Sequence, residues 1–147
     1  MSKVTQLHSA VKQGDLVRIK TLLGENRELA NSRSETDARG TYPLHVAAEF
    51  GQGNATRVLL EYGADVTLLD FENDAIALGW AAFFGRAEVV AVLLKAGSEP
   101  SQCNKHGLTP LGCALGGTKG KWKQFSDATL EDWQKAADTI RAYGGVE

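Results

Sequence analysis

Three side chains with metal-binding chemistry lie close together in the sequence, namely Cys103, His106 and Cys113. A structural zinc site needs four such ligands, and a catalytic zinc site needs three ligands plus water. No further histidine or cysteine lies near this C-x2-H-x6-C segment, and Cys113 occupies a small-residue, inward-facing position of an expected helix. Buried cysteine commonly behaves as a small apolar residue. We therefore expect no metal site here.

The segment from Gly116 to Lys121 has the glycine and lysine content of a phosphate-binding loop. The Walker pattern G-x-x-x-x-G-K-[S/T] requires glycine at 115 and serine or threonine at 122, where this chain has Leu115 and Trp122. An expected helix, rather than a strand, precedes the segment. We therefore predict no nucleotide site and no cofactor.

The sequence shows no combination of nucleophile, base and carboxylate that is typical of catalysis. His8 and His45 occupy equivalent positions in a repeated pattern, and no nucleophile recurs at a fixed spacing beside them. Glu131 and Asp132 are neighbours in one expected helix and so face different sides of it. We expect the chain not to be an enzyme and to have no small-molecule substrate.

A basic segment with interleaved aromatic residues runs from Lys119 through Lys121, Trp122 and Lys123 to Phe125. Such a segment can grip a phosphate backbone while its rings stack on bases. Alternatively, Trp122 and Phe125 fold back onto the last helix and leave the lysines in solvent. We favour the second interpretation, because three lysines provide only a small electrostatic footprint for nucleic acid.

Composition indicates a single globular domain. The chain has 147 residues, of which 43% are hydrophobic and 23% are charged, with a formal net charge of −2. This balance argues against a nucleic-acid partner at the level of the whole chain. Only two cysteines are present, and no apolar run approaches the roughly 20 residues of a membrane span. We therefore predict a cytoplasmic protein that does not enter a membrane.

The chain repeats itself with a period of 33 to 37 residues. Residues 44–51 (LHVAAEFG) recur as 78–85 (LGWAAFFG), with an earlier copy at 7–14 (LHSAVKQG) and a shorter one at 111–114 (LGCA). A Val-Leu-Leu motif follows at 58–60 and 92–94. Each unit is typical of two short helices that end at glycine. Such helices bury their apolar faces only against neighbouring units, as in a solenoid.

These motifs resemble the ankyrin repeat. Residues 37–48 (DARGTYPLHVAA) are similar to its opening D-x-x-G-x-T-P-L-H-x-A-A, with Tyr42 in place of threonine, and 63–66 (GADV) are similar to its closing motif. Residues 107–111 (GLTPL) repeat the opening. The resemblance implies an all-α fold, a short solenoid of about four helix-turn-helix repeats with hairpin loops. We expect units at 1–36, 37–70, 71–103 and 104–147.

The units also depart from the family pattern in the third unit and in the last one. Asp74 stands where the hairpin turn has glycine, and Gly79 stands where the family has a histidine that ties neighbouring loops together. By the resemblance, His8 and His45 have that structural role. The last unit has an insertion, expected from Gly116 to Thr129, followed by a capping helix. Its expected apolar face, between an N-cap at Thr129 and a stop at Gly144, is Leu130, Trp133, Ala137, Ile140 and Tyr143.

The resemblance implies a module that binds another protein through its concave groove and hairpin tips, as a stand-alone adaptor or an inhibitory or regulatory subunit. Large apolar residues at variable groove positions predict one exposed aromatic patch, formed by Phe50, Phe83 and Phe84, whereas Trp80 faces the core. The predicted partner-binding residues are Arg39, Thr41, Glu49, Phe50, Glu72, Asn73, Phe83, Phe84, Lys105 and His106. The alternative is contact with nucleic acid or an acidic partner through Lys119–Lys123.

Overall fold

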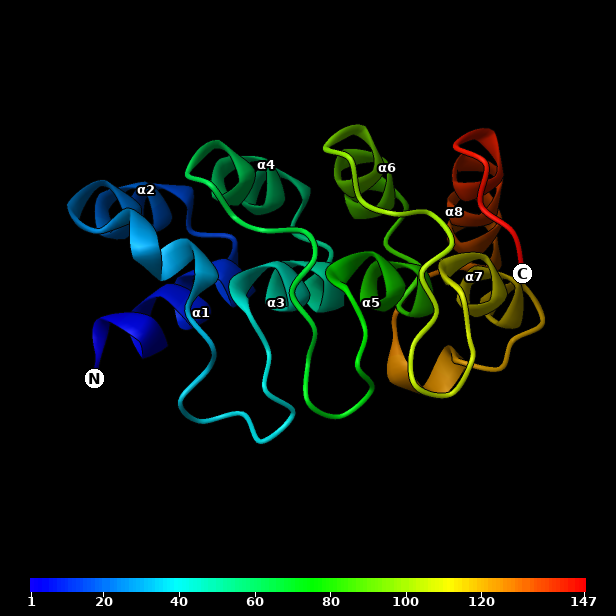
Figure 1. The fold of residues 1–147 in the computed structure, drawn as a ribbon, viewed down its shortest axis with the longest axis horizontal. Helices are drawn as coiled ribbons and strands as arrows, with labels where there is room; N and C mark the ends of the chain where they lie inside the picture. The colour runs from blue at the N-terminus through cyan, green and yellow to red at the C-terminus, as the bar shows by residue number, and fades with distance from the viewer.

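The structure, a computed structural model, describes residues 1–147 as eight α-helices and two short 3-10 helices without strands. The α-helices form four consecutive antiparallel pairs, as Figure 1 shows. The pairs are α1 (Lys3–Gln13) with α2 (Leu16–Glu25), α3 (Pro43–Phe50) with α4 (Gly53–Glu61), α5 (Ala77–Phe83) with α6 (Ala87–Lys95), and α7 (Pro110–Thr118) with α8 (Leu130–Ala142). The 3-10 helices are η1 (Arg27–Asn31) and η2 (Lys123–Phe125). The predicted all-α solenoid is confirmed.

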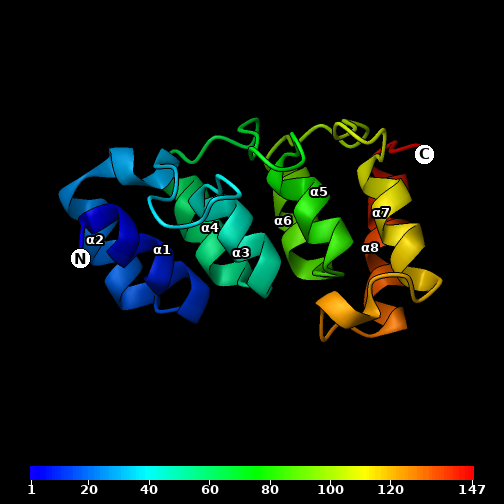
Figure 2. The ribbon, with the colours of Figure 1, turned by 90° about the horizontal axis from the view of Figure 1, so that it is seen from below.

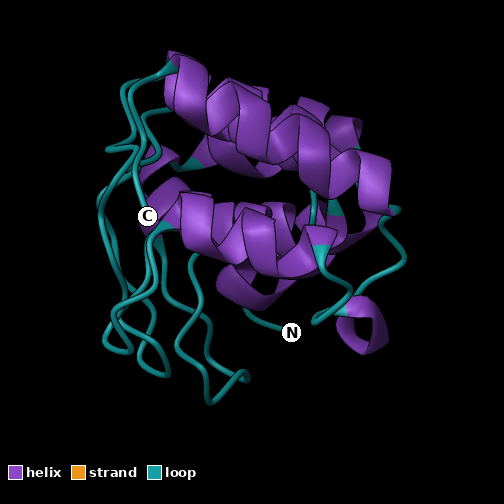
Figure 3. Ribbon diagram, turned by 90° about the vertical axis from the view of Figure 1, so that its right-hand side faces the viewer, coloured by secondary structure: helices purple, strands orange, loops and turns teal.

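The first helices of the pairs form one layer and the second helices form another (Figures 1 and 3). The long loops between pairs project to one side, below the inner layer of α1, α3, α5 and α7. We call the surface beneath the inner layer, beside these loops, the concave groove. The loops before α3, α5 and α7 are the three hairpins.

Helix ends follow local sequence signals. Thr109 precedes Pro110, and its side chain accepts a hydrogen bond from the N–H of Gly112 at the start of α7. Thr129 begins α8 in the same way, with Asp132 completing a reciprocal capping pair. Gly144, in the left-handed conformation, follows the end of α8. The expected cap and stop of this helix are therefore confirmed.

One apolar core runs through all four pairs. Alanines on the inner helices, such as Ala47 and Ala81, are fully buried and allow close approach of neighbouring helices. The outer helices contribute branched side chains, such as Leu59, Val90 and Leu93. Trp80 is 5% exposed and belongs to the same core, as predicted. Because each pair covers the next, no pair has a complete core of its own.

The hairpin turns repeat one backbone conformation. Gly40 and Gly107 have φ angles of 71° and 78°, and Asp74 has 48° at the equivalent position. Aspartate tolerates this left-handed region better than most side chains. The expectation that Asp74 can replace the turn glycine is confirmed.

The C-terminal unit corrects two expectations. Gly116, Gly117 and Thr118 continue helix α7, so the insertion begins at Lys119 rather than at Gly116. On α8, Trp133, Ala137 and Ile140 are buried as expected, together with Ala136. Leu130 and Tyr143 are exposed by 45% and 49%, because they lie at the two ends of the helix and α7 is too short to cover them.

Candidate functional site

The three hairpins are joined into a row by backbone hydrogen bonds. The N–H of Phe71 donates to the carbonyl of Arg39 at 2.8 Å, and the N–H of Lys105 donates to that of Asn73 at 2.9 Å. Glu72, Lys105 and His106 are exposed at the tips of this row, and Asn73 is half-buried. The structure thus brings these four predicted partner-binding residues together along one edge of the concave groove.

The guanidinium of Arg39 is fixed by contacts with three side chains of the same protein. Its guanidinium lies 2.8 Å from an oxygen of Asp37 and 2.9 Å from an oxygen of Glu49, and its Cζ is 4.9 Å from the centre of the Trp80 ring. The hydrogen bond from Arg39 lowers the pKa of Asp37. The predicted rim residues Arg39 and Glu49 are therefore ion-paired to each other at the base of the hairpin row.

Thr41 was predicted to contact a partner, and this is wrong. Its side chain is only 1% exposed. Residue 41 is at the inner end of the hairpin, where its carbonyl accepts a hydrogen bond from the N–H of Ser34 at 2.7 Å. The chain turns inward there to begin α3, so this side chain points into the protein rather than along the tips.

The two repeated histidines are structural, as predicted. Nδ1 of His45 accepts a hydrogen bond from the N–H of Tyr42, so Nε2 carries the proton that it donates to the carbonyl of Ala75 at 2.9 Å. His8 makes the equivalent contact to Ser32 at 2.9 Å. Burial lowers the pKa of both imidazoles, because the charged form loses its hydration. Both side chains tie an inner helix to the following loop.

The insertion folds back onto the concave groove. The Trp122 ring lies 4.7 Å from that of Phe83, its Nε1–H donates to the carbonyl of Cys113 at 2.7 Å, and its indole packs against Gly116. Phe125 lies 5.7 Å from Phe83. The expected folding back is confirmed for Trp122, but its target is wrong. The indole packs on α5 and α7 rather than on the last helix, because Gly116 leaves the space that it fills. Phe125 remains 56% exposed beside Phe83.

Two further contacts hold the end of the insertion. Ser126 Oγ–H donates to the carbonyl of Phe84 at 2.7 Å, and Asp127 pairs with Arg86 at 2.6 Å. Lys119, Lys121 and Lys123 are exposed, as predicted, and none forms an ion pair. In Figure 2 the insertion, drawn in orange, lies at the ends of α5 and α7 that are opposite the hairpins.

Phe83 and Phe84 belong to a chain of ring contacts that starts inside the core. His45 contacts Trp80 edge to face at 5.3 Å, Trp80 contacts Phe84 at 6.0 Å, and Phe84 contacts Phe83 at 5.1 Å. Both phenylalanines are half-buried, and the insertion covers part of Phe83. Phe84 therefore connects the core to Phe83, and Phe83 contacts the insertion.

Phe50 lies apart from these rings. It is 39% exposed, and the Nζ atom of Lys12 lies 5.1 Å from the centre of its ring. Its nearest hollow is shared with Arg86 and Lys135, not with Phe83. The structure thus separates the expected single aromatic patch into two places.

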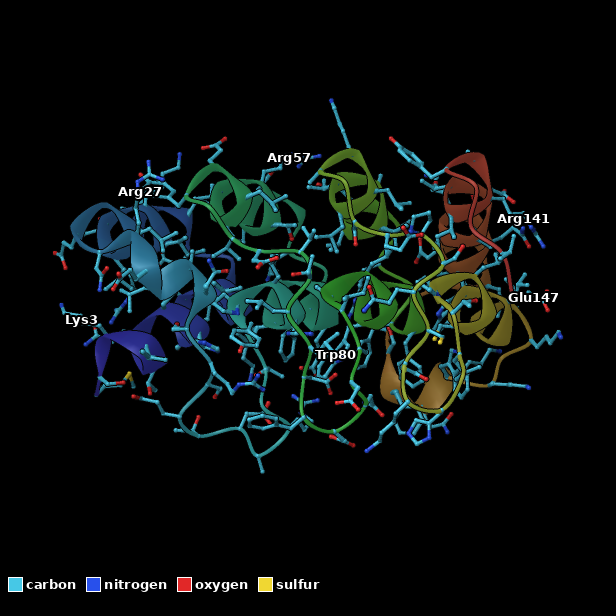
Figure 4. The ribbon with its side chains drawn as sticks, viewed as in Figure 1. Lys3, Arg27, Arg57, Trp80, Arg141 and Glu147 are labelled. Atoms are coloured by element: carbon cyan, nitrogen blue, oxygen red, sulfur yellow. The ribbon has the colours of Figure 1, made fainter.

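A cavity of about 410 Å³ opens between the hairpin row and the insertion. Its apolar side is formed by Trp80, Phe83, Leu108 and Phe125, and its polar side by Arg39, Glu72, Asn73, Asn104 and His106, while Ala75, Gly79 and Cys113 complete the lining. Trp80 is labelled in Figure 4 on the hairpin side of the inner helices. Its buried Nε1–H has no acceptor in the protein. We call this feature the hairpin cavity.

The residues with metal-binding chemistry are separated by the fold. Cys103 is exposed, whereas Cys113 is buried in α7, where burial raises the pKa of its thiol to about 11. No three His, Cys, Asp or Glu side chains are grouped so that they could hold a metal ion. No helix has the length and apolar character needed to cross a bilayer.

Sequence reasoning missed the hairpin cavity and the contact between Trp122 and Phe83. A position-by-position comparison of the repeats could have indicated the cavity. Gly79 is equivalent to His45 in the preceding repeat, and Cys113 is equivalent to Trp80, so both positions change from a large to a small side chain. Nothing in the repeat pattern indicates where the insertion packs, since it has no counterpart in the other units.

Comparison with known proteins supports the repeat architecture. Residues 2–70 match the model of the family described as ankyrin repeats (3 copies). Among curated relatives, human transient receptor potential cation channel subfamily A member 1 is 32% identical over 109 residues, which cover 73% of this chain and 9% of the relative. The inactive serine/threonine-protein kinase TEX14 of Bos taurus is 31% identical over 139 residues, or 93% of this chain and 9% of the relative.

Human ankyrin repeat and SOCS box protein 2 is 36% identical over 100 residues, or 67% of this chain and 15% of the relative. The chain thus matches only a small part of each of these proteins. Residues 2–70, which the family model matches, include helices α1 to α4 and the first hairpin. These repeats and their architecture place the chain in the ankyrin-repeat family.

Proposed function

We propose that this chain binds a protein partner through its hairpin row and concave groove, as an adaptor or as an inhibitory or regulatory subunit. Ankyrin repeats are generally protein-interaction modules, and their fold is a non-catalytic one. The observation that carries the proposal is the row of exposed tip side chains, Glu72, Lys105 and His106, beside the hairpin cavity. Polar residues around a recess with aromatic walls are the usual composition of a protein-binding surface.

The proposal assigns no catalytic step to the chain and places it in the cytoplasm. The buried histidines are engaged in loop contacts, and the two cysteines are free thiols, which fits a reducing compartment. Within the groove, Glu72, Asn73, Lys105, His106 and Phe83 are the proposed partner contacts. Arg39 and Glu49 support them from within, and Phe50 provides a second, separate contact.

Photo-crosslinking from defined positions tests this proposal. A photoreactive benzoylphenylalanine replaces Glu72 at a hairpin tip or, as a matched control, the exposed Lys95 at the end of outer helix α6. In lysate of the native host, we expect protein adducts from position 72 and far fewer from position 95. Equal yields from both positions, or adducts from position 95 alone, would contradict binding through the hairpin row.

A second candidate function, contact with nucleic acid through Lys119–Lys123, rests on three exposed lysines without ion-pair partners. The packing of Trp122 weakens this candidate. Its ring packs against Phe83 and its Nε1–H is hydrogen-bonded to the carbonyl of Cys113, so the ring is not free to stack on a base. Single-stranded DNA binding that falls steeply between 50 and 200 mM salt, and that is lost when the three lysines become glutamine, would favour this candidate.

A further inference from the structure

The hairpin cavity owes its space to a change between successive repeats. In the centre of the molecule, His45 of α3 and Trp80 of α5 contact each other edge to face, and His45 also reaches the carbonyl of Ala75 in the second hairpin. One repeat later, the equivalent positions are Gly79 of α5 and Cys113 of α7, and both residues line the cavity. A hydrogen atom and a small thiol side chain thus replace an imidazole and an indole, and the space remains open.

The cavity is shaped for an aromatic group. Three rings line it, from Trp80, Phe83 and Phe125, together with the apolar side chain of Leu108. Aromatic pairs gain about 0.5–1.5 kcal/mol beyond the burial of their area when they meet edge to face or offset. The volume of about 410 Å³ exceeds that of a single ring, and the cavity is open to solvent, since its lining residues Glu72, His106 and Leu108 are exposed.

The mouth of the cavity carries an unbalanced negative charge. The one guanidinium in its lining, Arg39, is paired with two carboxylates, Asp37 and Glu49. Glu72 also lines the cavity and forms no ion pair. The neighbouring Asp74 is exposed as well, so these two carboxylates outnumber the one exposed ammonium group at the tips, that of Lys105. A cation deep in the cavity would lie near Arg39, whereas a cation at the mouth would meet the free carboxylate of Glu72.

We propose that the hairpin cavity receives one aromatic side chain of a partner protein, next to a basic residue that pairs with Glu72. The proposal rests on the function proposed above and gives the chemistry of the partner segment. The aromatic ring occupies the space left by Gly79 and Cys113, between Trp80 and Phe83. The basic side chain remains at the mouth, within reach of Glu72 and away from Arg39.

Titration of the ¹⁵N-labelled full chain with small probes tests the pocket without the partner. The probe is N-acetyl-arginyl-phenylalaninamide, and the reporter is the indole N–H resonance of Trp80. The indole N–H groups of Trp122 and Trp133 are internal controls, because both are already hydrogen-bonded, to the carbonyls of Cys113 and Phe83. We expect saturable shifts of the Trp80 resonance and of the Asn73 and Asn104 amides.

Two control probes separate the contributions of ring and charge. N-acetyl-glutamyl-phenylalaninamide keeps the ring and should bind about two- to fivefold more weakly, the effect of one exposed ion pair. N-acetyl-arginyl-alaninamide keeps the charge and should bind at least about tenfold more weakly, because it lacks the anchor. If the alanine probe binds as well as the phenylalanine probe, the cavity recognises the cation and the proposal is wrong.

Two variants locate the binding. Gly79→Leu fills the cavity from its floor, and the nearest atom to a Cβ at this position is 3.7 Å away, so the helix tolerates the new side chain. It should weaken probe binding at least about tenfold, without lowering the melting temperature. Glu72→Gln should remove the difference between the arginyl and glutamyl probes. Unchanged binding to Gly79→Leu would overturn the proposal.

The outcomes distinguish this inference from the proposed function. If the probes fail to shift Trp80 while position 72 still crosslinks a partner, the chain binds protein but not through an aromatic anchor in this cavity. If the probes bind as expected while position 72 gives no crosslinks, the function through the hairpin row is wrong and the cavity remains a ligand site. Shifts confined to resonances distant from the cavity would contradict the inference outright.

Discussion

At the scale of single residues, glycine has opposite roles at different positions of this solenoid. Gly117 lies in α7, where alanine would ordinarily favour the helix by about 1 kcal/mol. A Cβ there would lie 2.0 Å from Cδ1 of Trp133, a fully buried ring whose Nε1–H donates to the carbonyl of Phe83 at 3.0 Å. Packing at this position therefore outweighs helix propensity.

We expect Gly117→Ala to destabilise the protein by about 1–3 kcal/mol, because the indole of Trp133 must shift within a filled core. Gly24→Ala is the matched control, since Gly24 lies in α2 with no atom within 4 Å of a Cβ. That change should raise stability by up to about 1 kcal/mol. Urea denaturation of both variants measures the difference, and a stabilised Gly117→Ala would show that Trp133 is not seated on this glycine.

The histidine ties make stability depend on pH. Burial holds the pKa of His45 and the pKa of His8 below the ordinary value of histidine. As the pH falls below about 6.5, the unfolded chain therefore binds more protons than the folded chain does. The free energy of unfolding should be constant above pH 7.5 and decrease between pH 7 and 5. The decrease is at most about 1.4 kcal/mol per pH unit for each histidine.

His45→Gln should be less stable than the wild type at pH 7.5, because it loses the contact to Ala75, but its stability should depend less on pH between 7 and 5. His106→Gln, a change at an exposed tip, is the control and should keep the dependence of the wild type. Denaturation midpoints of the wild type and both variants, measured across this pH range, compare the pH dependence of their stability. An identical decrease in His45→Gln and the wild type would mean that other groups cause it.

At the scale of elements, the insertion has one ring packed on the groove, that of Trp122, and three lysines in solvent. Trp122 packs on α5 and α7, whereas the three lysines are exposed and Phe125 is 56% exposed beside Phe83. Because the insertion packs on the groove, Phe83 has two roles. Phe83 supports the insertion as well as the hairpin cavity, so its replacement by alanine affects folding and binding together.

We expect Trp122→Ala to destabilise the protein by about 2–4 kcal/mol, because it removes a ring packed against Phe83 and Gly116 and a hydrogen bond to Cys113. The combined change of Lys119, Lys121 and Lys123 to glutamine should stay within about 0.5 kcal/mol of the wild type. Thermal melting compares the two. If the lysine variant melts as early as Trp122→Ala, the charges stabilise the insertion and the rings do not.

At the scale of the whole molecule, the solenoid is closed at its C-terminal end by α8. This helix packs against both α6 and α7, and its buried residues Trp133, Ala136, Ala137 and Ile140 complete the last part of the shared core. Its outer face is polar, as required of a terminal element. The helix is thus amphipathic, with a buried apolar face and an exposed polar face.

Deletion of the residues after Ser126 should expose the apolar faces of α6 and α7 and produce a chain that aggregates or melts early. The control is Leu130→Ala with Tyr143→Ala, which alters the two exposed ends of α8 and should change stability by less than about 1 kcal/mol. Size-exclusion chromatography and thermal melting report the result. A truncated chain that remains monomeric with an unchanged melting temperature would show that α8 adds nothing to the core.

The features that recur along the chain can be predicted from the amino-acid sequence. The period near 34 residues predicted four helix pairs, Asp74 was recognised as a turn residue, and the role of His45 followed from its place in the repeat. These features depend on neighbours within one unit or on the next unit at a constant spacing. Local signals and the repeated pattern are therefore sufficient to predict them.

The contents of the groove, in contrast, depend on tertiary packing. Trp122 reaches Phe83, 39 positions earlier in the chain, and Thr41 turns inward although it is one residue from a hairpin turn. The hairpin cavity depends on two small residues in different repeats, Gly79 and Cys113, that face the same space. The insertion has no period, and the fit of one side chain into the space left by another depends on three-dimensional packing rather than on spacing along the chain.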